Sequence, residues 1–175
     1  MTQTNQPQPE KLVTAEDALK QAILLEMNGH EYFIMAANSA RSKPARELFE
    51  FMAAEEDHHL KVLKITFNNL LKNGSWELPT KEELNFAFDN PILNHEFMDR
   101  LKESYFDSSA ISIALTLEEK AFKFYQEAEK QTDDPEGKKL FRWLTEWEME
   151  HHERLRGLDE EMREEFWSNS NFWPM

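Results

Sequence analysis

The sequence contains one pattern twice, as LFEFMAAEEDHHLKVL at residues 48–63 and as LFRWLTEWEMEHHERL at residues 140–155. The two stretches align without a gap at an offset of 92 residues, and each carries Glu-x-x-His within a row of apolar residues. Apolar residues spaced three and four positions apart lie on one face of an α-helix. We therefore expect two equivalent amphipathic helices, each with a glutamate and a histidine on its apolar face.

The same offset relates the stretches that precede this pair, because Glu26 matches Glu118. Each half of the chain then reads Glu, thirty residues, and Glu-x-x-His. A helix rises ~1.5 Å per residue, so the chain covers roughly 22 Å from Glu26 to the turn near Pro44 and roughly 18 Å back to Glu56. The two carboxylates should return to nearly the same level of an antiparallel helix pair.

Apolar periodicity and turn signals predict long helices over about residues 14–39, 44–73, 108–130 and 135–162. The first and third connections are short, whereas about residues 75–107 form a long crossover interrupted by Pro79 and Asn90-Pro91. Two antiparallel helical hairpins joined by one crossover are typical of the ferritin-like four-helix bundle. We predict this all-α fold over residues 11–165, with a flexible N-terminal tail at 1–10 and an aromatic C-terminal tail at 166–175.

The composition argues against several classes of function. The chain has 175 residues, a formal net charge of -14 and no cysteine. Nucleic acids and anionic membranes bind basic patches, so neither is expected as a partner. The lack of cysteine excludes disulfides, thiolate metal sites and cysteine nucleophiles. No signal pattern opens the sequence and no stretch approaches ~18 apolar residues, so we expect a cytoplasmic protein.

The polar residues on the apolar helix faces need a partner in the core. Buried ionised carboxylates are costly unless they are paired or bound to metal. Carboxylate oxygens with a minority of imidazole nitrogens suit iron or manganese rather than structural zinc. We predict a di-metal centre of the kind known in four-helix bundles, with two bridging glutamates and with ligands from Glu26, Glu56, His59, Glu118, Glu148 and His151.

A second Glu-x-x-His, formed by Glu55 and His58, competes with the motif one residue later. The repeat favours the later motif, because Glu55 would match Trp147 instead of an acidic residue. His58 and His152 adjoin the two motifs, and we interpret them as groups behind the ligands or on the surface.

Over about residues 12–160 the chain resembles the rubrerythrin-like branch of the ferritin-like superfamily. The resemblance rests on Glu26, Glu118 and the two Glu-x-x-His motifs. It implies two iron ions per chain, with manganese as the alternative, and a homodimer or higher homo-oligomer. Tyr125 matches a tyrosine near the metals in that family and is the candidate catalytic residue.

The sequence departs from that family at three points. Rubrerythrins proper carry an extra carboxylate one turn after the third-helix ligand, and Ala121 stands there in this chain. The tyrosine expected on the first helix is replaced by Phe33, with Tyr32 adjacent. The cysteine-ligated rubredoxin domain is lacking because the sequence has no cysteine, so a separate electron donor protein would have to supply electrons.

Three functions are compatible with these features. The resemblance favours a di-iron oxidoreductase that acts on hydrogen peroxide or dioxygen. The alternative is an iron-binding protein of the ferroxidase type, used in iron storage or detoxification. The third is a ferritin-like scaffold without metal, which the complete set of six ligand residues argues against.

Overall fold

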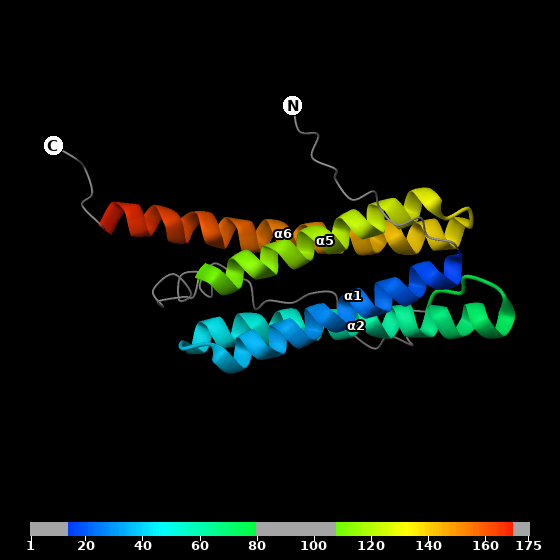
Figure 1. The fold of residues 1–175 in the computed structure, drawn as a ribbon, viewed down its shortest axis with the longest axis horizontal. Helices are drawn as coiled ribbons and strands as arrows, with labels where there is room; N and C mark the ends of the chain where they lie inside the picture. Colours follow the sequence, from blue (N-terminus) through cyan, green and yellow to red (C-terminus); the bar gives the residue numbers. More distant parts are fainter. Residues whose placement is uncertain (1–13, 80–107, 170–175) are drawn as a thin grey trace, which may run out of the picture.

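The structure is a computed structural model that describes residues 14–79 and 108–169. Within these ranges the chain forms four long helices and no strand: α1 (Ala15–Ser39), α2 (Lys43–Asn73), α5 (Ser108–Gln131) and α6 (Pro135–Asn169). Figure 1 shows them as two hairpins that run side by side along the long axis of the molecule. The predicted all-α four-helix bundle is confirmed.

The ends of the first hairpin follow the capping signals in the sequence. The Thr14 hydroxyl accepts the backbone N–H of Asp17 at 3.1 Å, and the Ser42 hydroxyl accepts that of Ala45 at 3.2 Å. Each hydroxyl satisfies an N–H that has no partner within its own helix. Gly74 follows the last residue of α2 with φ of 68°, the left-handed conformation that ends helices and that glycine adopts at little cost.

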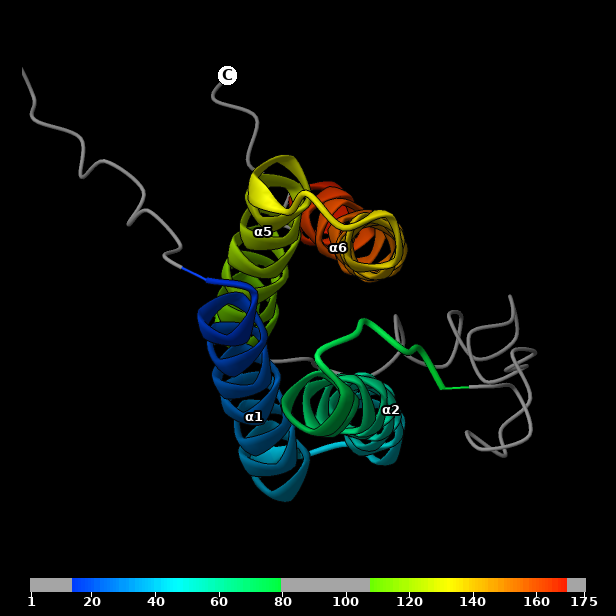
Figure 2. The same cartoon turned by 90° about the vertical axis from the view of Figure 1, so that its right-hand side faces the viewer.

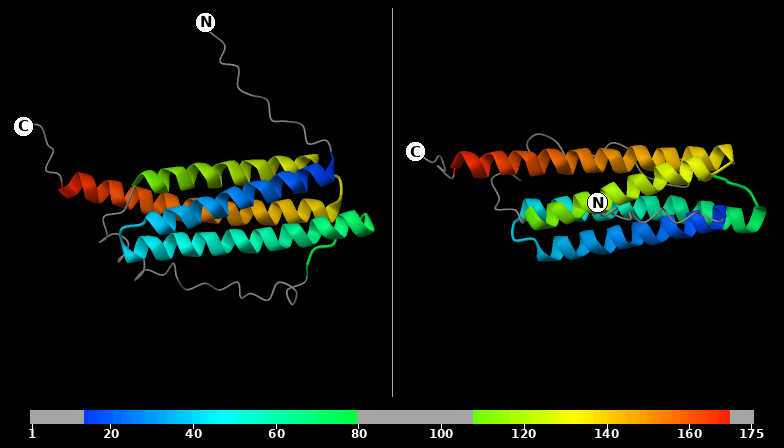
Figure 3. Two further views of the ribbon diagram at one scale, coloured as in Figure 1. Left: turned by 60° about the horizontal axis from the view of Figure 1, so that its bottom comes forward. Right: turned by 45° about the horizontal axis from the view of Figure 1, so that its top comes forward.

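The bundle is built from two tightly packed helix pairs. α1 packs on α2 and α5 packs on α6, and α1 also contacts α5. The end-on view in Figure 2 and the two tilted views in Figure 3 show the α1–α2 pair against the α5–α6 pair. Side chains from all four helices therefore meet along a central axis.

Two apolar clusters divide the core along that axis. The first contains buried side chains such as Leu19, Leu63, Tyr125 and Phe141, and the second contains Phe33, Phe49, Met52, Ile111 and Leu155. On every helix, the predicted ligand positions lie between a residue of one cluster and a residue of the other. The layer of the core that contains the predicted ligands is thus enclosed on both sides, along the bundle axis, by apolar side chains.

The structure differs from the predicted boundaries at the C-terminal end. α6 continues to Asn169, so the first residues of the predicted aromatic tail at 166–175 are helical. The predicted N-terminal tail and most of the predicted crossover lie outside the described residues. None of the described helices is long and apolar enough to cross a membrane.

Candidate metal centre

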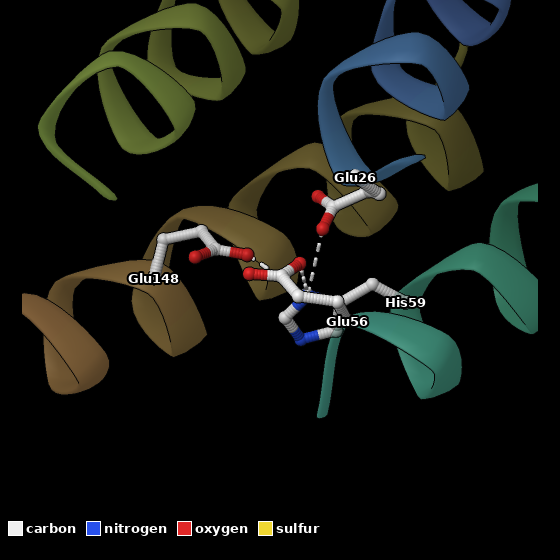
Figure 4. A group of neighbouring side chains, drawn as sticks. All are labelled: Glu26, Glu56, His59 and Glu148. Carbon is white, nitrogen blue, oxygen red and sulfur yellow. Dashed lines mark hydrogen bonds and ion pairs between the residues drawn. The ribbon is translucent and has the colours of Figure 1, made fainter. Parts of the chain in front are cut away.

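All six predicted ligand residues meet at one level of the bundle. α1 contributes one glutamate and α5 another, while α2 and α6 each contribute one Glu-x-x-His motif. None of these side chains is more than 3% exposed. Figure 4 shows four of them converging from three helices, namely Glu26, Glu56, His59 and Glu148.

The six residues form two overlapping groups of potential ligands, in each of which the ligand atoms lie within 4.8 Å of one another. Glu56 and Glu148 belong to both groups. The first group adds Glu26 and His59, and the second adds the residues 92 positions later, Glu118 and His151. The sequence repeat thus becomes a two-fold pseudo-symmetry of the site, in which Glu56 and Glu148 are shared by the two halves.

Both histidines direct the same ring nitrogen at the carboxylates. Nδ1 of His59 lies 2.9 Å from Oε1 of Glu148, 3.2 Å from Oε2 of Glu26 and 3.6 Å from Oε2 of Glu56. Nδ1 of His151 lies 3.6 Å from Oε2 of Glu118 and 3.6 Å from Oε2 of Glu148. Nδ1 is therefore the nitrogen that each imidazole offers to a metal.

Burial and mutual repulsion shift the protonation of these carboxyl groups when no metal is present. Burial, together with the nearby Glu26 and Glu148, raises the pKa of Glu56 well above its ordinary value. Burial and Glu148 do the same to the pKa of Glu118. Burial also acts to raise the pKa of Glu148, but His59 beside it prevails and lowers that pKa well below its ordinary value.

Burial and the neighbouring carboxylates also shift the pKa values of the two imidazoles, and the two influences oppose each other. Burial alone would lower the pKa of each ring, because it disfavours the charged form. The surrounding carboxylates prevail and raise the pKa values of His59 and His151 well above the ordinary range. Protons therefore supply part of the positive charge that a metal pair would otherwise bring.

The donor atoms fit a pair of metal ions. Among the described residues, neither carboxylate oxygen of Glu118 nor Nδ1 of His151 has a hydrogen-bond partner, although both side chains are buried. Buried polar atoms are nearly always paired in folded proteins, so the site needs a further partner. Four carboxylates and two imidazoles form a hard, mainly oxygen donor set, which suits iron or manganese.

Tyr125 lies against this site from α5. It is fully buried, and its hydroxyl donates a hydrogen bond to Oε1 of Glu26. Burial and the charge of Glu26 raise the pKa of Tyr125 well above its ordinary value, so the hydroxyl keeps its proton. Tyr32 does not provide a second such group, because its hydroxyl donates to the backbone carbonyl of Ala110 at 2.6 Å.

Two residues that were not predicted as site residues lie behind the ligands. Glu55 is 8% exposed, and its Oε2 accepts the indole N–H of Trp147 at 3.1 Å. The same N–H points at Nε2 of His151 at 2.9 Å. Glu55 and Trp147 are 92 positions apart, so they are equivalent positions that touch across the pseudo-symmetry axis. The sequence signal that could have identified both residues is this mismatch in the repeat, with glutamate in one half and tryptophan in the other.

A pocket of about 200 Å³ reaches the site between α1 and α5. Apart from Glu56, its lining consists of pairs at the same offset of 92: Leu25 with Leu117, Glu26 with Glu118, Asn28 with Lys120, and Gly29 with Ala121. A Cβ on Gly29 would lie 3.1 Å from Cδ and Oε1 of Glu56. Small residues at 29 and 121 thus leave space beside the carboxylates for a small molecule.

Comparisons with known proteins agree with this geometry. A solved structure, that of a hypothetical protein from Pyrococcus furiosus, matches with a TM-score of 0.61 and 22% sequence identity, over 87% of this chain and 92% of that one. At that identity the match shows the shared fold. No curated protein matches the sequence. The sequence model of the Rubrerythrin family matches residues 17–159, which include all six predicted ligands and Tyr125, and the chain therefore belongs to the rubrerythrin family.

Proposed function

We propose that this protein is a di-iron oxidoreductase that reduces hydrogen peroxide or dioxygen. The observation that carries the proposal is the pair of overlapping ligand groups, in which four buried carboxylates and two buried imidazoles converge from all four helices. Membership of the rubrerythrin family supports the same reading. The ligands are proposed to be Glu26, Glu56, His59, Glu118, Glu148 and His151.

The charge of the site supports two divalent ions. Four carboxylates carry four negative charges, which two divalent cations neutralise without any help from protons. Buried charge is tolerated when it is neutralised by a metal or a partner. Two ferrous ions held by these residues would supply the two electrons that, together with two protons, convert hydrogen peroxide to two molecules of water.

The chain's own residues would bind the oxidant and manage protons. The pocket between α1 and α5 gives a small oxidant a route to Glu56 and Glu118. The two apolar clusters exclude bulk water from the rest of the site. Tyr125 keeps a proton at its hydroxyl next to Glu26, where it can donate to a developing oxyanion as a general acid. A separate electron donor protein would return electrons to the centre.

Anaerobic loading with Fe(II) tests the proposal directly. We expect about two irons per native chain and a loss of binding in Glu118→Ala, because that variant removes a buried carboxylate whose oxygens have no hydrogen-bond partner among the described residues. Glu119→Ala is the matched control, since the side chain of this neighbouring glutamate is 47% exposed and pairs with Lys123. Absence of tight iron binding in the native chain would disprove the di-iron centre.

The reaction with oxidant then separates the enzyme from an iron-storage protein. For the enzyme, one hydrogen peroxide should oxidise the two bound irons, and reduction should restore the ferrous state repeatedly with the iron retained. Iron that leaves the site after oxidation and accumulates as a mineral would favour ferroxidase-type storage instead.

A further inference from the structure

The two halves of the candidate metal centre differ in what surrounds the outer nitrogen of each histidine. Nε2 of His59 is buried, and it has no hydrogen-bond partner within the described part of the chain. The His59 ring instead packs at steep angles against two indoles, with centroids 5.9 Å from Trp143 and 5.3 Å from Trp147. An indole face offers an N–H donor only a weak acceptor.

The outer nitrogen of His151 has polar neighbours. Nε2 lies 2.9 Å from the indole nitrogen of Trp147 and 3.9 Å from Oε2 of Glu55. The same carboxylate accepts the Trp147 N–H at 3.1 Å, and its other oxygen lies 3.4 Å from Nδ1 of His58. A buried carboxylate is therefore anchored next to His151.

The repeat explains why only one histidine has this arrangement. Glu55 and Trp147 are equivalent positions on α2 and α6, so a symmetric site would carry the same residue at both. Because one position is glutamate and the other tryptophan, the two side chains form a single hydrogen bond across the axis. That hydrogen bond lies beside Nε2 of His151.

Metal binding would make Glu55 the acceptor for His151. Nδ1 of His151 faces Glu118 and Glu148, so a metal would bind there and the neutral ring would carry its proton on Nε2. Nε2–H and the indole N–H would then both be donors, and neither could accept from the other. Glu55 has free acceptor capacity for both, because a carboxylate can accept about four hydrogen bonds.

We propose that Glu55, held in place by Trp147, positions His151 and so makes the two metal positions unequal. The metal bound by Glu118 and His151 is then held more tightly than the metal bound by Glu26 and His59. A carboxylate that accepts the outer N–H of a ligand histidine fixes the ring and raises its basicity. Loss of such a partner typically weakens metal binding by about 10–100-fold. The inference rests on the proposed di-metal centre.

A metal titration of the full chain tests this inference. Metal-free protein is titrated anaerobically with Co(II), whose visible absorbance reports each ion as it binds. For the native chain we expect two separate binding steps. Glu55→Ala should weaken the tighter step by about 10–100-fold and leave the weaker step within about three-fold. Glu55→Gln, which keeps an acceptor oxygen but loses the charge, should give an intermediate affinity.

Further variants assign the steps and control for the loss of charge. His151→Ala should abolish the tighter step, and His59→Ala should abolish the weaker one. Glu50→Ala removes one exposed glutamate from the same helix and should leave both steps unchanged. Circular dichroism of each variant verifies that the helices are intact.

The possible outcomes separate this inference from the proposed function. Two equal steps in the native chain, or an equal loss of both steps in Glu55→Ala, would overturn the inequality while leaving the di-metal centre in place. A complete lack of Co(II) binding would overturn the centre and the inference together.

Discussion

The hydroxyl of Tyr125 on α5 donates a hydrogen bond to Oε1 of Glu26 on α1, and so joins the two helical hairpins at the level of the candidate metal centre. Glu26 also accepts from Nδ1 of His59 through its other oxygen at 3.2 Å. One carboxylate therefore connects a tyrosine of one hairpin to a histidine of the other. The orientation of Glu26 depends on both contacts.

We expect Tyr125→Phe to keep two metals per chain but to slow oxidation of the ferrous protein by hydrogen peroxide about 10²-fold. The ligands remain, whereas the proton donor near the oxidant is lost, and a general acid contributes at least that factor. Stopped-flow absorbance after anaerobic iron loading measures the rate. The variant should also lose about 1.5–3 kcal/mol of stability, the usual contribution of a hydrogen bond to a charged group.

Tyr32→Phe is the matched control for this prediction. Tyr32 also joins α1 to α5, but its hydroxyl donates to the Ala110 carbonyl and not to a ligand. Its loss should lower the melting temperature without slowing oxidation. Equal rates for native protein and Tyr125→Phe would show that Tyr125 has no part in proton transfer.

Replacement of Gly29 by alanine should weaken metal binding, because the added Cβ would lie 3.1 Å from Cδ and Oε1 of Glu56. Glu56 must then move, and it belongs to both ligand groups. We expect both affinities to fall about ten-fold or more, by analogy with other changes that displace a ligand. Calorimetric titration with Mn(II), which stays divalent in air for longer than iron, measures the change.

Gly157→Ala is the control for the effect of alanine on a helix. Nothing lies within 4 Å of a Cβ built on Gly157, which is in the middle of α6. This variant should be more stable by about 0.5–1 kcal/mol and bind metal normally, since alanine is the better helix former. Unchanged metal affinity in Gly29→Ala would contradict the tight approach of Glu56.

The sequence was sufficient to predict that these six residues meet at one level of the bundle. Glu26, Glu56 and their equivalents recur at one offset on apolar helix faces, and helix geometry alone brings such positions to one level. The caps at Thr14, Ser42 and Gly74 depend likewise on purely local chemistry, which is why the ends of the first two helices were close to those predicted.

Contacts between side chains of different helices could not be predicted from the sequence. The repeat aligns Glu55 with Trp147, but a one-dimensional offset does not show that equivalent positions meet at the symmetry axis. The extension of α6 to Asn169 was missed for another reason. Its last turns lack a clear apolar period, and ion pairs within the helix, such as Arg163 with Asp159 at 2.8 Å, contribute to its stability.

Glu118→Leu should stabilise the metal-free protein and abolish normal metal loading. Both oxygens of Glu118 are buried without a hydrogen-bond partner among the described residues, so the carboxyl group costs stability when no metal is bound. Removing it should raise the free energy of unfolding by about 1–3 kcal/mol. That corresponds to about 2–4 °C in melting temperature per kcal/mol for a chain of this size. Thermal denaturation in the presence of a chelator measures the shift.

The neighbouring substitution Glu119→Leu provides the comparison. The side chain of Glu119 is half exposed and lies outside the core, so its replacement should change stability by no more than about 0.5 kcal/mol. A metal-free Glu118→Leu that is less stable than the native chain would show that the ion pair between Glu118 and His151 outweighs the cost of burying the carboxyl group.

The metal-free and metal-loaded proteins should respond to pH in opposite directions. Folding raises the pKa values of Glu56, Glu118, His59 and His151, so the folded state holds more protons than the unfolded chain. The stability that the histidines contribute is fully present below about pH 6.5 and is lost as the pH rises through their folded values. The pKa of Glu148 is lowered, so the stability that this carboxylate contributes is present at neutral pH and is lost only as the pH falls into the acid range. From pH 6 to pH 9 the metal-free melting temperature should therefore decrease.

Bound metal should reverse this trend because metal ions displace the same protons. Affinity for the metal rises with pH when ligands must lose protons, and a ligand that binds only the folded state stabilises it more as affinity increases. The difference in melting temperature between loaded and metal-free protein should thus grow from pH 6 to pH 9. His151→Gln should flatten the metal-free slope, whereas His30→Gln, which alters a partly exposed histidine paired with Asp57 at 3.6 Å, should preserve it. A metal-free melting temperature that increases over this range would contradict the proton-filled site and leave the buried carboxylates to be neutralised in some other way.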